Sequence, residues 1–196
     1  LRPDGKAMRI GRVPWRPPVK ALVQNPVPAF PPISLVLPAK DEGTGWRRAQ
    51  ESLRALRYPE ERIEVLELAP GMNRAQARNA VLGKARHPCI AFVSERGLFP
   101  PDWLVAARRR FEENANVACV VTPLVCLPGC DISSHVALPF AAGCHALYRK
   151  EVFASLGEFD PDLEQDMDLD MIYRLSDKGL WKWEILNFRQ QVRDST

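Results

Sequence analysis

Four short apolar runs alternate with three stretches of helical periodicity between residues 33 and 125. The apolar runs cover residues 33–38, 63–68, 89–93 and 116–125, and the helical stretches cover residues 46–56, 74–86 and 100–114. Short, nearly continuous apolar runs are typical of strands buried on both faces. Because strands that are joined through helices run parallel, the alternation predicts an α/β fold: a mostly parallel sheet with helices on both faces.

Polar loops follow three of the predicted strands. They read AKDEG (39–43), APGMN (69–73) and SERG (94–97). The carboxyl ends of parallel strands lie at one edge of a sheet, and ligands of such sheets bind beyond that edge. We therefore expect the functional site to be built from these loops.

The N-terminal segment, residues 1–32, contains eight of the 18 prolines in the chain. Proline lacks a backbone N–H and fixes φ, so this segment is expected to run extended and to form neither a helix nor a central strand. We interpret it as an arm or linker that packs on the rest of the chain through Trp15 and Phe30. Residues 33–196 then form the folded domain, and the arm is a candidate contact for a protein partner.

The composition argues against several classes of protein. The net charge is +3 with acids and bases interspersed, so no nucleic-acid partner is expected. No apolar run is long enough to span a bilayer and no signal peptide is visible, which favours the cytoplasm, including the cytoplasmic face of a membrane. Five cysteines, at positions 89, 119, 126, 130 and 144, lack a second tight pair. This pattern favours packed free thiols in a reducing environment over a zinc site.

The stretch EQDMDLDMIYRL (164–175) places Glu164, Asp166, Asp168 and Asp170 at every second position, just before an apolar run. The helix macrodipole favours acids at a helix start, so a solvated helix N-terminus is one interpretation. A site that needs a base or a bound cation is the other. Periodicity alone favours the first interpretation.

Four segments of the chain resemble the family-two glycosyltransferases, which have the GT-A fold and move a sugar from a nucleotide-sugar donor to an acceptor. The segments are PPISLVLPAKDEG (31–43), RAQARNAVLGKARHPCIAFV (74–93), LFPPDWL (98–104) and the region from 141 to 183, which contains a GEFD turn and the acid cluster. The resemblance implies a GT-A-like (nucleotide-diphospho-sugar transferase) fold. It also implies an inverting transfer to a hydroxyl group of a carbohydrate or glycoconjugate acceptor, as in polysaccharide or glycoconjugate biosynthesis.

The acid cluster carries the most specific part of the resemblance. In the family, a Glu-Asp pair precedes a helix, a second Asp follows two places on, and an Arg comes six places after the paired Asp. Asp168, Asp170 and Arg174 have that spacing, with Met167 in the Glu position. The resemblance makes Asp168 the candidate general base, which removes the proton of the acceptor hydroxyl; Asp166 is the second choice, under a two-residue shift. The residues assigned to the acceptor side are Gly143, Asp170 and Arg174.

The resemblance also implies a set of donor-binding residues beyond the carboxyl ends of the strands. They are Pro38, Lys40, Asp41, Arg78, Asn79, Ser94, Glu95 and Arg96. Asp41 is alternatively an N-cap for the helix that follows, and Arg78 and Asn79 alternatively belong to a packed helix face. His145 has apolar neighbours and is interpreted as a packed strand residue rather than a catalyst.

Two departures from the family pattern affect the donor side. The family's Asp-x-Asp motif, which holds Mg²⁺ or Mn²⁺ against the donor diphosphate, is replaced by Ser-Glu-Arg at 94–96. Only Glu95 is left as a metal ligand, and Arg96 alternatively binds the phosphate directly. The family's Asp-Asp-Gly-Ser is replaced by Ala-Pro-Gly at 69–71.

These departures leave other functions open. The main alternative is a degenerate, catalytically inactive glycosyltransferase-like domain that acts as a binding or scaffolding module. A nucleotidyltransferase of similar sheet topology is a third interpretation, which fits the acid cluster less well.

Overall fold

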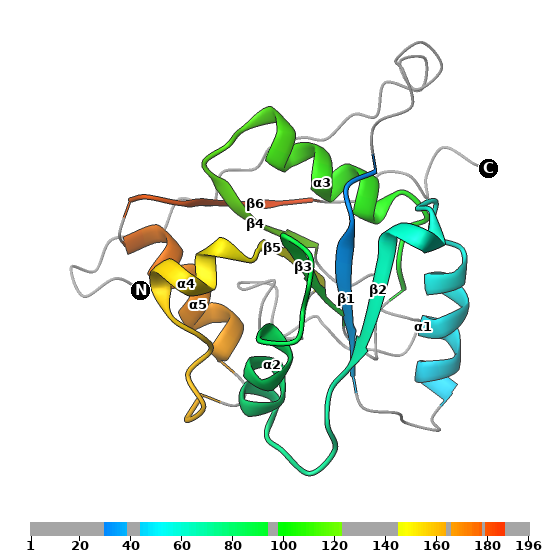
Figure 1. The fold of residues 1–196 in the computed structure, drawn as a ribbon, viewed down its shortest axis with the longest axis horizontal. Coiled ribbons are helices and arrows are strands. Elements are labelled where there is room, and N and C mark those ends of the chain that lie inside the picture. The colour runs from blue at the N-terminus through cyan, green and yellow to red at the C-terminus, as the bar shows by residue number, and fades with distance from the viewer. Residues whose placement is uncertain are drawn as a thin grey trace, which may run out of the picture.

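The structure, a computed structural model, describes residues 30–38, 44–93, 98–122, 145–163, 166–177 and 179–186. In this part of the chain six strands form one sheet in the order β2-β1-β3-β5-β4-β6 (Figure 1). The strands are β1 (Ile33–Leu37), β2 (Ile63–Glu67), β3 (Cys89–Phe92), β4 (Val117–Thr122), β5 (His145–Arg149) and β6 (Lys182–Ile185).

The sheet is mostly parallel, as predicted. β1 pairs in parallel with β2 and β3, and β4 pairs in parallel with β6. Among the six described strands, β5 alone runs antiparallel to its neighbours, with β3 on one side and β4 on the other. The four predicted strands are confirmed as β1 to β4, whereas the antiparallel insertion of β5 between β3 and β4 was not part of the predicted alternation.

Within the described residues, five helices cover the two faces of this sheet. They are α1 (Thr44–Arg54), α2 (Arg74–Leu82), α3 (Trp103–Glu113), α4 (Glu151–Leu156) and α5 (Met167–Asp177), with a 3-10 turn at Glu60–Arg62. α1 and α3 lie on one face, and α2, α4 and α5 lie on the other (Figure 1). No helix within the described ranges is long and apolar enough to cross a membrane.

The central strands owe their apolar sequences to this double cover. Every residue of β3 and β4 is buried, because helices pack on both faces. The side chains alternate between two cores, so that Ile90 and Phe92 pack with α2, α4 and α5 while Cys89 and Ala91 pack with α1 and α3. At the edge of the sheet β2 is less covered, and Val65 is 55% exposed.

The loop between β2 and α2 contains two local signals that place the start of α2. Gly71 has φ +79°, a conformation that residues with a Cβ rarely adopt. Asn73 then caps α2, because its Oδ1 accepts a hydrogen bond from the backbone N–H of Gln76 at 2.8 Å. The helix N-terminus is thereby fixed beyond the carboxyl end of β2.

The last residues of the predicted arm contact Tyr58, which lies between α1 and β2. The ring of Phe30 meets that of Tyr58 edge-on, with centroids 5.1 Å apart, and the Tyr58 hydroxyl donates to the Pro31 carbonyl at 2.5 Å. Burial of this hydroxyl raises the pKa of Tyr58. Trp15 lies outside the described residues, and the division into arm and domain stays a prediction.

Candidate functional site

Asp168, the predicted base, is buried near the start of α5. Its side chain is 5% exposed, and Oδ1 accepts a hydrogen bond from Nη1 of Arg78 at 2.5 Å. The Arg78 side chain is 6% exposed, so both charges are removed from bulk water. Removing charges from water is costly unless they are paired. The carboxylate therefore sits in the protein as one half of a buried ion pair.

Two aromatic rings enclose the guanidinium of this pair. The Cζ atom of Arg78 lies 4.7 Å from the ring centroid of Phe92 and 5.2 Å from that of Phe159. Both distances are within the range of cation–π attraction. Phe92 is the last residue of β3, so the ion pair lies at the carboxyl end of a central strand, the edge at which such sheets bind ligands.

Two asparagines of the α2 region bind the turn that precedes α5. Asn79 Nδ2 donates to the Phe159 carbonyl at 2.7 Å, and the Phe159 N–H donates to Asn79 Oδ1 at 3.0 Å. Asn73 Nδ2 donates to the Pro161 carbonyl at 2.9 Å. In this structure Arg78 and Asn79, both predicted donor-binding residues, thus contact Asp168 and Phe159 respectively, and their binding to a donor stays a prediction.

Arg174, assigned to the acceptor side, holds the end of α4 against α5. Its guanidinium pairs with Asp170 at 2.6 Å and donates at 2.9 Å to the carbonyls of Leu156 and Glu158. Gly157, between those carbonyls, turns the chain with φ +86°. The contacts of Arg174 and Asp170 anchor the backbone around the buried carboxylate, and their contact with an acceptor stays a prediction.

Asp166, the second choice for the base, differs from Asp168 in its surroundings. It is exposed, and its backbone carbonyl accepts a hydrogen bond from the N–H of Asp170 in the first turn of α5 at 2.8 Å. This arrangement is that of a solvated acid at a helix start, where the macrodipole favours negative charge. The sequence left two interpretations of the acid cluster open, and each applies to one residue. Asp166 is a solvated acid at a helix start, and Asp168 is a buried acid of the candidate site.

The structure describes only part of the predicted donor side. Pro38 is half-buried directly after β1, beside the carboxyl ends of β1 and β3. The predicted site residues outside the described residues are Lys40, Asp41, Gly143, Ser94, Glu95 and Arg96.

A metal site is not formed by the described residues. They contain no group of three or more His, Cys, Asp or Glu side chains that could hold a metal ion. Asp168, the buried acid at the carboxyl end of β3, is already paired with Arg78, whose charge opposes a cation. The part of the site that the structure describes does not fit Mg²⁺ or Mn²⁺, and the ligand role of Glu95 stays a prediction.

Two of the five cysteines lie on described strands. Cys89 and Cys119 are buried and pack in the two cores. Burial raises the pKa of Cys89, so its thiol stays protonated and unreactive at neutral pH. Both act as small hydrophobic residues, as predicted.

His145 is fully buried at the start of β5. Its ring centroid lies 4.0 Å from that of Phe99 and 5.5 Å from that of Trp103, whose Nε1 donates to Thr122 Oγ1 at 2.9 Å. Burial lowers the pKa of His145 to about 3, against the opposing effect of a hydrogen bond with the backbone of Leu98. The imidazole is therefore neutral at physiological pH, and the prediction of a packed strand residue is confirmed.

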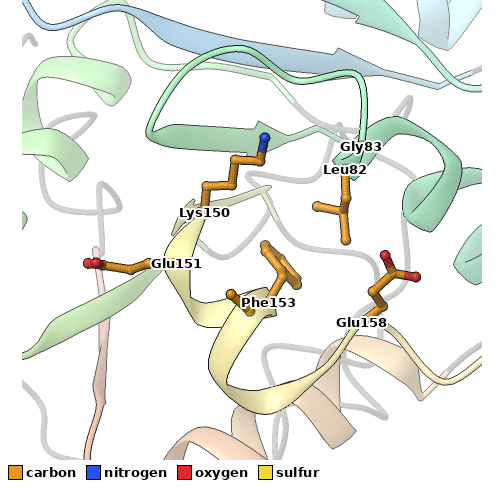
Figure 2. Close-up of a pocket in the computed structure, with 7 residues that line it drawn as sticks. Leu82, Gly83, Lys150, Glu151, Phe153 and Glu158 are labelled. Atoms are coloured by element: carbon orange, nitrogen blue, oxygen red, sulfur yellow. The ribbon is translucent and has the colours of Figure 1, made fainter.

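An open hollow of about 470 Å³ lies between α2 and α4 (Figure 2). Figure 2 shows Lys150 and Glu158 on opposite sides of it, with Phe153 between them. Lys150 Nζ donates to the Ala85 carbonyl at 2.6 Å, and its backbone N–H donates to the Pro88 carbonyl, just before β3 begins. The hollow therefore lies toward the amino end of β3, opposite the edge at which the ion pair lies.

The partnership of Arg78 with Asp168 was missed at the sequence level. The two residues are 90 positions apart, so no local pattern links them. A weaker signal was present: Arg78 shares a helix face with Ala75, Val81 and Leu82, all of which are buried. An arginine on the buried face of a helix needs an anionic partner.

Comparisons with known proteins place this architecture among known folds. No protein-family model matches the sequence, and no curated protein matches it either. Solved structures do resemble the fold. The mannosyltransferase PcManGT from Pyrobaculum calidifontis, in complex with GDP-Man and Mn²⁺, has a TM-score of 0.60 at 15% identity, covering 82% of this chain and 56% of its own.

Two further structures resemble the fold with slightly lower TM-scores. Glucosyl-3-phosphoglycerate synthase from Mycobacterium tuberculosis, in complex with Mg²⁺ and UDP, has a TM-score of 0.55 at 15% identity, covering 81% of this chain and 70% of its own. S. aureus TarS 1–349 in complex with UDP has a TM-score of 0.56 at 12% identity, covering 79% and 57%.

The chain has a GT-A-like fold, the α/β architecture of nucleotide-sugar transferases. The predicted fold is thereby confirmed, whereas membership of family two stays a prediction. The chain spans less than two thirds of the length of PcManGT and TarS. At these identities the likeness concerns the fold, and the activity has to be argued from the site.

Proposed function

We propose that the chain is the donor-binding and catalytic part of an inverting glycosyltransferase, which moves a sugar from a nucleotide-sugar donor to a hydroxyl of a carbohydrate or glycoconjugate acceptor. The observation that carries the proposal is Asp168: a buried carboxylate at the start of α5, next to the carboxyl end of β3, in a GT-A-like fold. The complexes of the structural neighbours with GDP-Man and UDP support a nucleotide-sugar donor.

Transfer would proceed by a single displacement. The acceptor hydroxyl loses its proton to Asp168 while its oxygen attacks the anomeric carbon, and the bond from that carbon to the diphosphate oxygen breaks with its electron pair leaving on the diphosphate. A base must be held rigidly to act in this way. Arg174 and Asn79 supply that rigidity, because they bind the backbone on the N-terminal side of Asp168.

The negative charge of the diphosphate needs a positive partner on the donor side. We assign this role to Arg96 and Arg78, because a guanidinium binds phosphate oxygens through a planar fork. Pro38, Lys40 and Asp41, from the loop after β1, would line the nucleoside. Mg²⁺ or Mn²⁺ held by Glu95 is the alternative source of positive charge, and nucleotide binding measured with and without EDTA distinguishes the two.

A second candidate function is that of a catalytically inactive, glycosyltransferase-like binding or scaffolding module, whose partner contacts include the N-terminal arm. The observation in its favour is the ion pair itself, because Arg78 neutralises the charge of Asp168. Under this alternative the pair is a structural element only.

Calorimetric titration with UDP-, GDP- and dTDP-sugars, each with Mn²⁺ and with EDTA, tests the donor site. Acceptor-dependent release of UDP, GDP or dTDP then tests transfer. We expect Asp168→Asn to abolish transfer while nucleotide binding is retained. The matched control is Asp177→Asn, because Asp177 is an exposed acid at the other end of the same helix. Binding without transfer would favour the scaffolding module, and an active Asp168→Asn variant would remove Asp168 from its proposed role.

A further inference from the structure

The ion pair poses a problem for catalysis by Asp168. Within the part of the chain that the structure describes, the carboxylate has a single hydrogen-bond partner, Arg78, and both side chains are nearly inaccessible. A general base has to reach the proton that it removes, directly or through one water. While paired in this way the carboxylate is neutralised and closed to an acceptor hydroxyl.

Arg78 lies where a second anion can compete for it. Its guanidinium lies over the ring of Phe92, the last residue of β3, and therefore at the carboxyl end of the sheet, where ligands of such sheets bind and where the donor diphosphate would lie under the proposed function. A diphosphate offers more negative charge than one carboxylate and more oxygens to the guanidinium fork. It is therefore the stronger partner for Arg78.

The surrounding backbone is held independently of the ion pair. Asn79 and Asn73 bind the backbone of Phe159 and Pro161, and Arg174 binds the carbonyls at the end of α4. None of these contacts involves the Arg78 or Asp168 side chains. The pair can therefore open through movement of side chains while the turn before α5 keeps its place.

We propose that Arg78 and Asp168 form a latch that the donor opens. The inference rests on the proposed function: the donor diphosphate takes the guanidinium of Arg78, and the carboxylate of Asp168 is released to receive the proton of the acceptor hydroxyl. Donor binding and activation of the base are thereby the same event.

Calorimetry with UDP, GDP and dTDP on a set of variants tests the latch. Asp168→Asn removes the charge that competes for Arg78, so the affinity for the nucleotide that binds should rise about tenfold, as for an ordinary coupling between two sites. Arg78→Met should weaken binding, and the double variant should behave as Arg78→Met does, because the competition exists only while Arg78 is present. Asp177→Asn should leave the affinity as in the wild type.

Two results overturn the latch in different ways. If the wild type binds none of the three nucleotides, with or without Mn²⁺, the proposed function fails and the latch fails with it. If the wild type binds and the affinity of Asp168→Asn is unchanged or lower, the latch alone is wrong and the pair is structural.

A measurement on the wild type covers the case in which these variants do not fold. The ¹⁵N–¹H signal of Arg78 Nε, assigned by its loss in Arg78→Lys, should shift when the bound nucleotide is added to saturation. Arg149 is the matched control, because it is also stacked on a ring, that of Phe111 at 4.7 Å, and donates to the carbonyls of Val117 and Phe111. If Arg78→Lys is also unfolded, the signal is assigned by through-bond experiments. An Arg78 signal that does not shift at saturation overturns the latch.

Discussion

Asn79 and Phe159 exchange two hydrogen bonds between elements that are 80 residues apart in the chain. The amide of Asn79 satisfies both the N–H and the carbonyl of Phe159, at 3.0 and 2.7 Å. One side chain therefore replaces the two bonds that this backbone would otherwise form in a strand or with water. The turn before α5 is fixed to α2 by this contact, and the buried carboxylate is fixed with it.

Asn79→Ala should destabilise the protein by about 1–3 kcal/mol, because it leaves a half-buried N–H and a half-buried carbonyl without their partners. Urea unfolding followed by circular dichroism measures the loss. Gln76→Ala on the exposed face of α2 is the matched control and should change the free energy of unfolding by less than about 0.5 kcal/mol. Equal effects at the two positions would contradict the assignment.

The buried ion pair predicts a non-additive response to mutation. Arg78→Met alone should cost about 3–5 kcal/mol of stability, since it leaves the Asp168 charge buried without a partner. Arg78→Met combined with Asp168→Leu should cost much less, because no buried charge remains. A double-mutant cycle in urea measures the coupling.

A pair on the protein surface provides the control for this cycle. Arg57 and Asp102 lie 3.2 Å apart with side chains 71% and 39% exposed. Arg57→Met should change stability by no more than about 1 kcal/mol, because water screens exposed pairs. If the two arginine variants lose equal stability, the Arg78 pair is not buried in solution.

The strands could be predicted because their burial is expressed locally. CIAF and VACVVT are nearly continuous apolar runs, because helices cover both faces of these strands. An apolar run of this kind in the sequence therefore indicates a strand that is buried on both faces. The direction of β5 could not be predicted in the same way. HALYR resembles any short buried strand, and its antiparallel course depends on the connection from β4 rather than on its own residues.

The candidate site was predicted residue by residue but not as an arrangement. The spacing of Asp168, Asp170 and Arg174 was visible in the sequence, and the family resemblance singled out Arg78 and Asn79. Their contacts were not visible, because each joins α2 to a segment about 80 to 90 residues away. Such contacts depend on how α2 and α5 pack on one face of the sheet, and that packing is a property of the whole fold.

Glu64 should make stability depend on pH in the acid range. Burial acts to raise its pKa, but hydrogen bonds from Ser34 Oγ at 2.6 Å and from the backbone and Nε of Arg86 outweigh it and lower the pKa to about 2 from 4.5. The carboxylate therefore contributes stability that is fully present above pH 4.5 and is lost as the pH falls toward 2.

Glu64→Gln keeps the size of the side chain and removes the charge. We expect the variant to be less stable than the wild type at pH 7 and the difference to shrink progressively below pH 4.5. Urea unfolding at several pH values between 7 and 3 measures it. A difference that stays constant over this range would show that the charge of Glu64 does not stabilise the fold.

His145 should produce a second pH dependence, in a different range. Burial lowers its pKa from 6.5 in the unfolded chain to about 3, so the unfolded state binds a proton at pH values where the folded state does not. The stability contributed by the neutral ring is fully present above pH 6.5 and is lost as the pH falls toward 3. Between those limits the unfolded state binds one more proton than the folded state. The free energy of unfolding therefore falls by about 1.4 kcal/mol for each unit by which the pH is lowered.

His145→Phe isolates this effect, because it keeps a ring beside Phe99 and Trp103 and cannot be protonated. The free energy of unfolding of the wild type should fall more steeply than that of the variant between pH 6 and pH 4.5, by about 1.4 kcal/mol per pH unit at most. Carboxylates that titrate in both proteins cancel in the comparison, and the effect of Glu64 begins only below this range. Parallel curves for the two proteins would mean that water reaches the imidazole, and that the carboxyl end of β4 is open in solution.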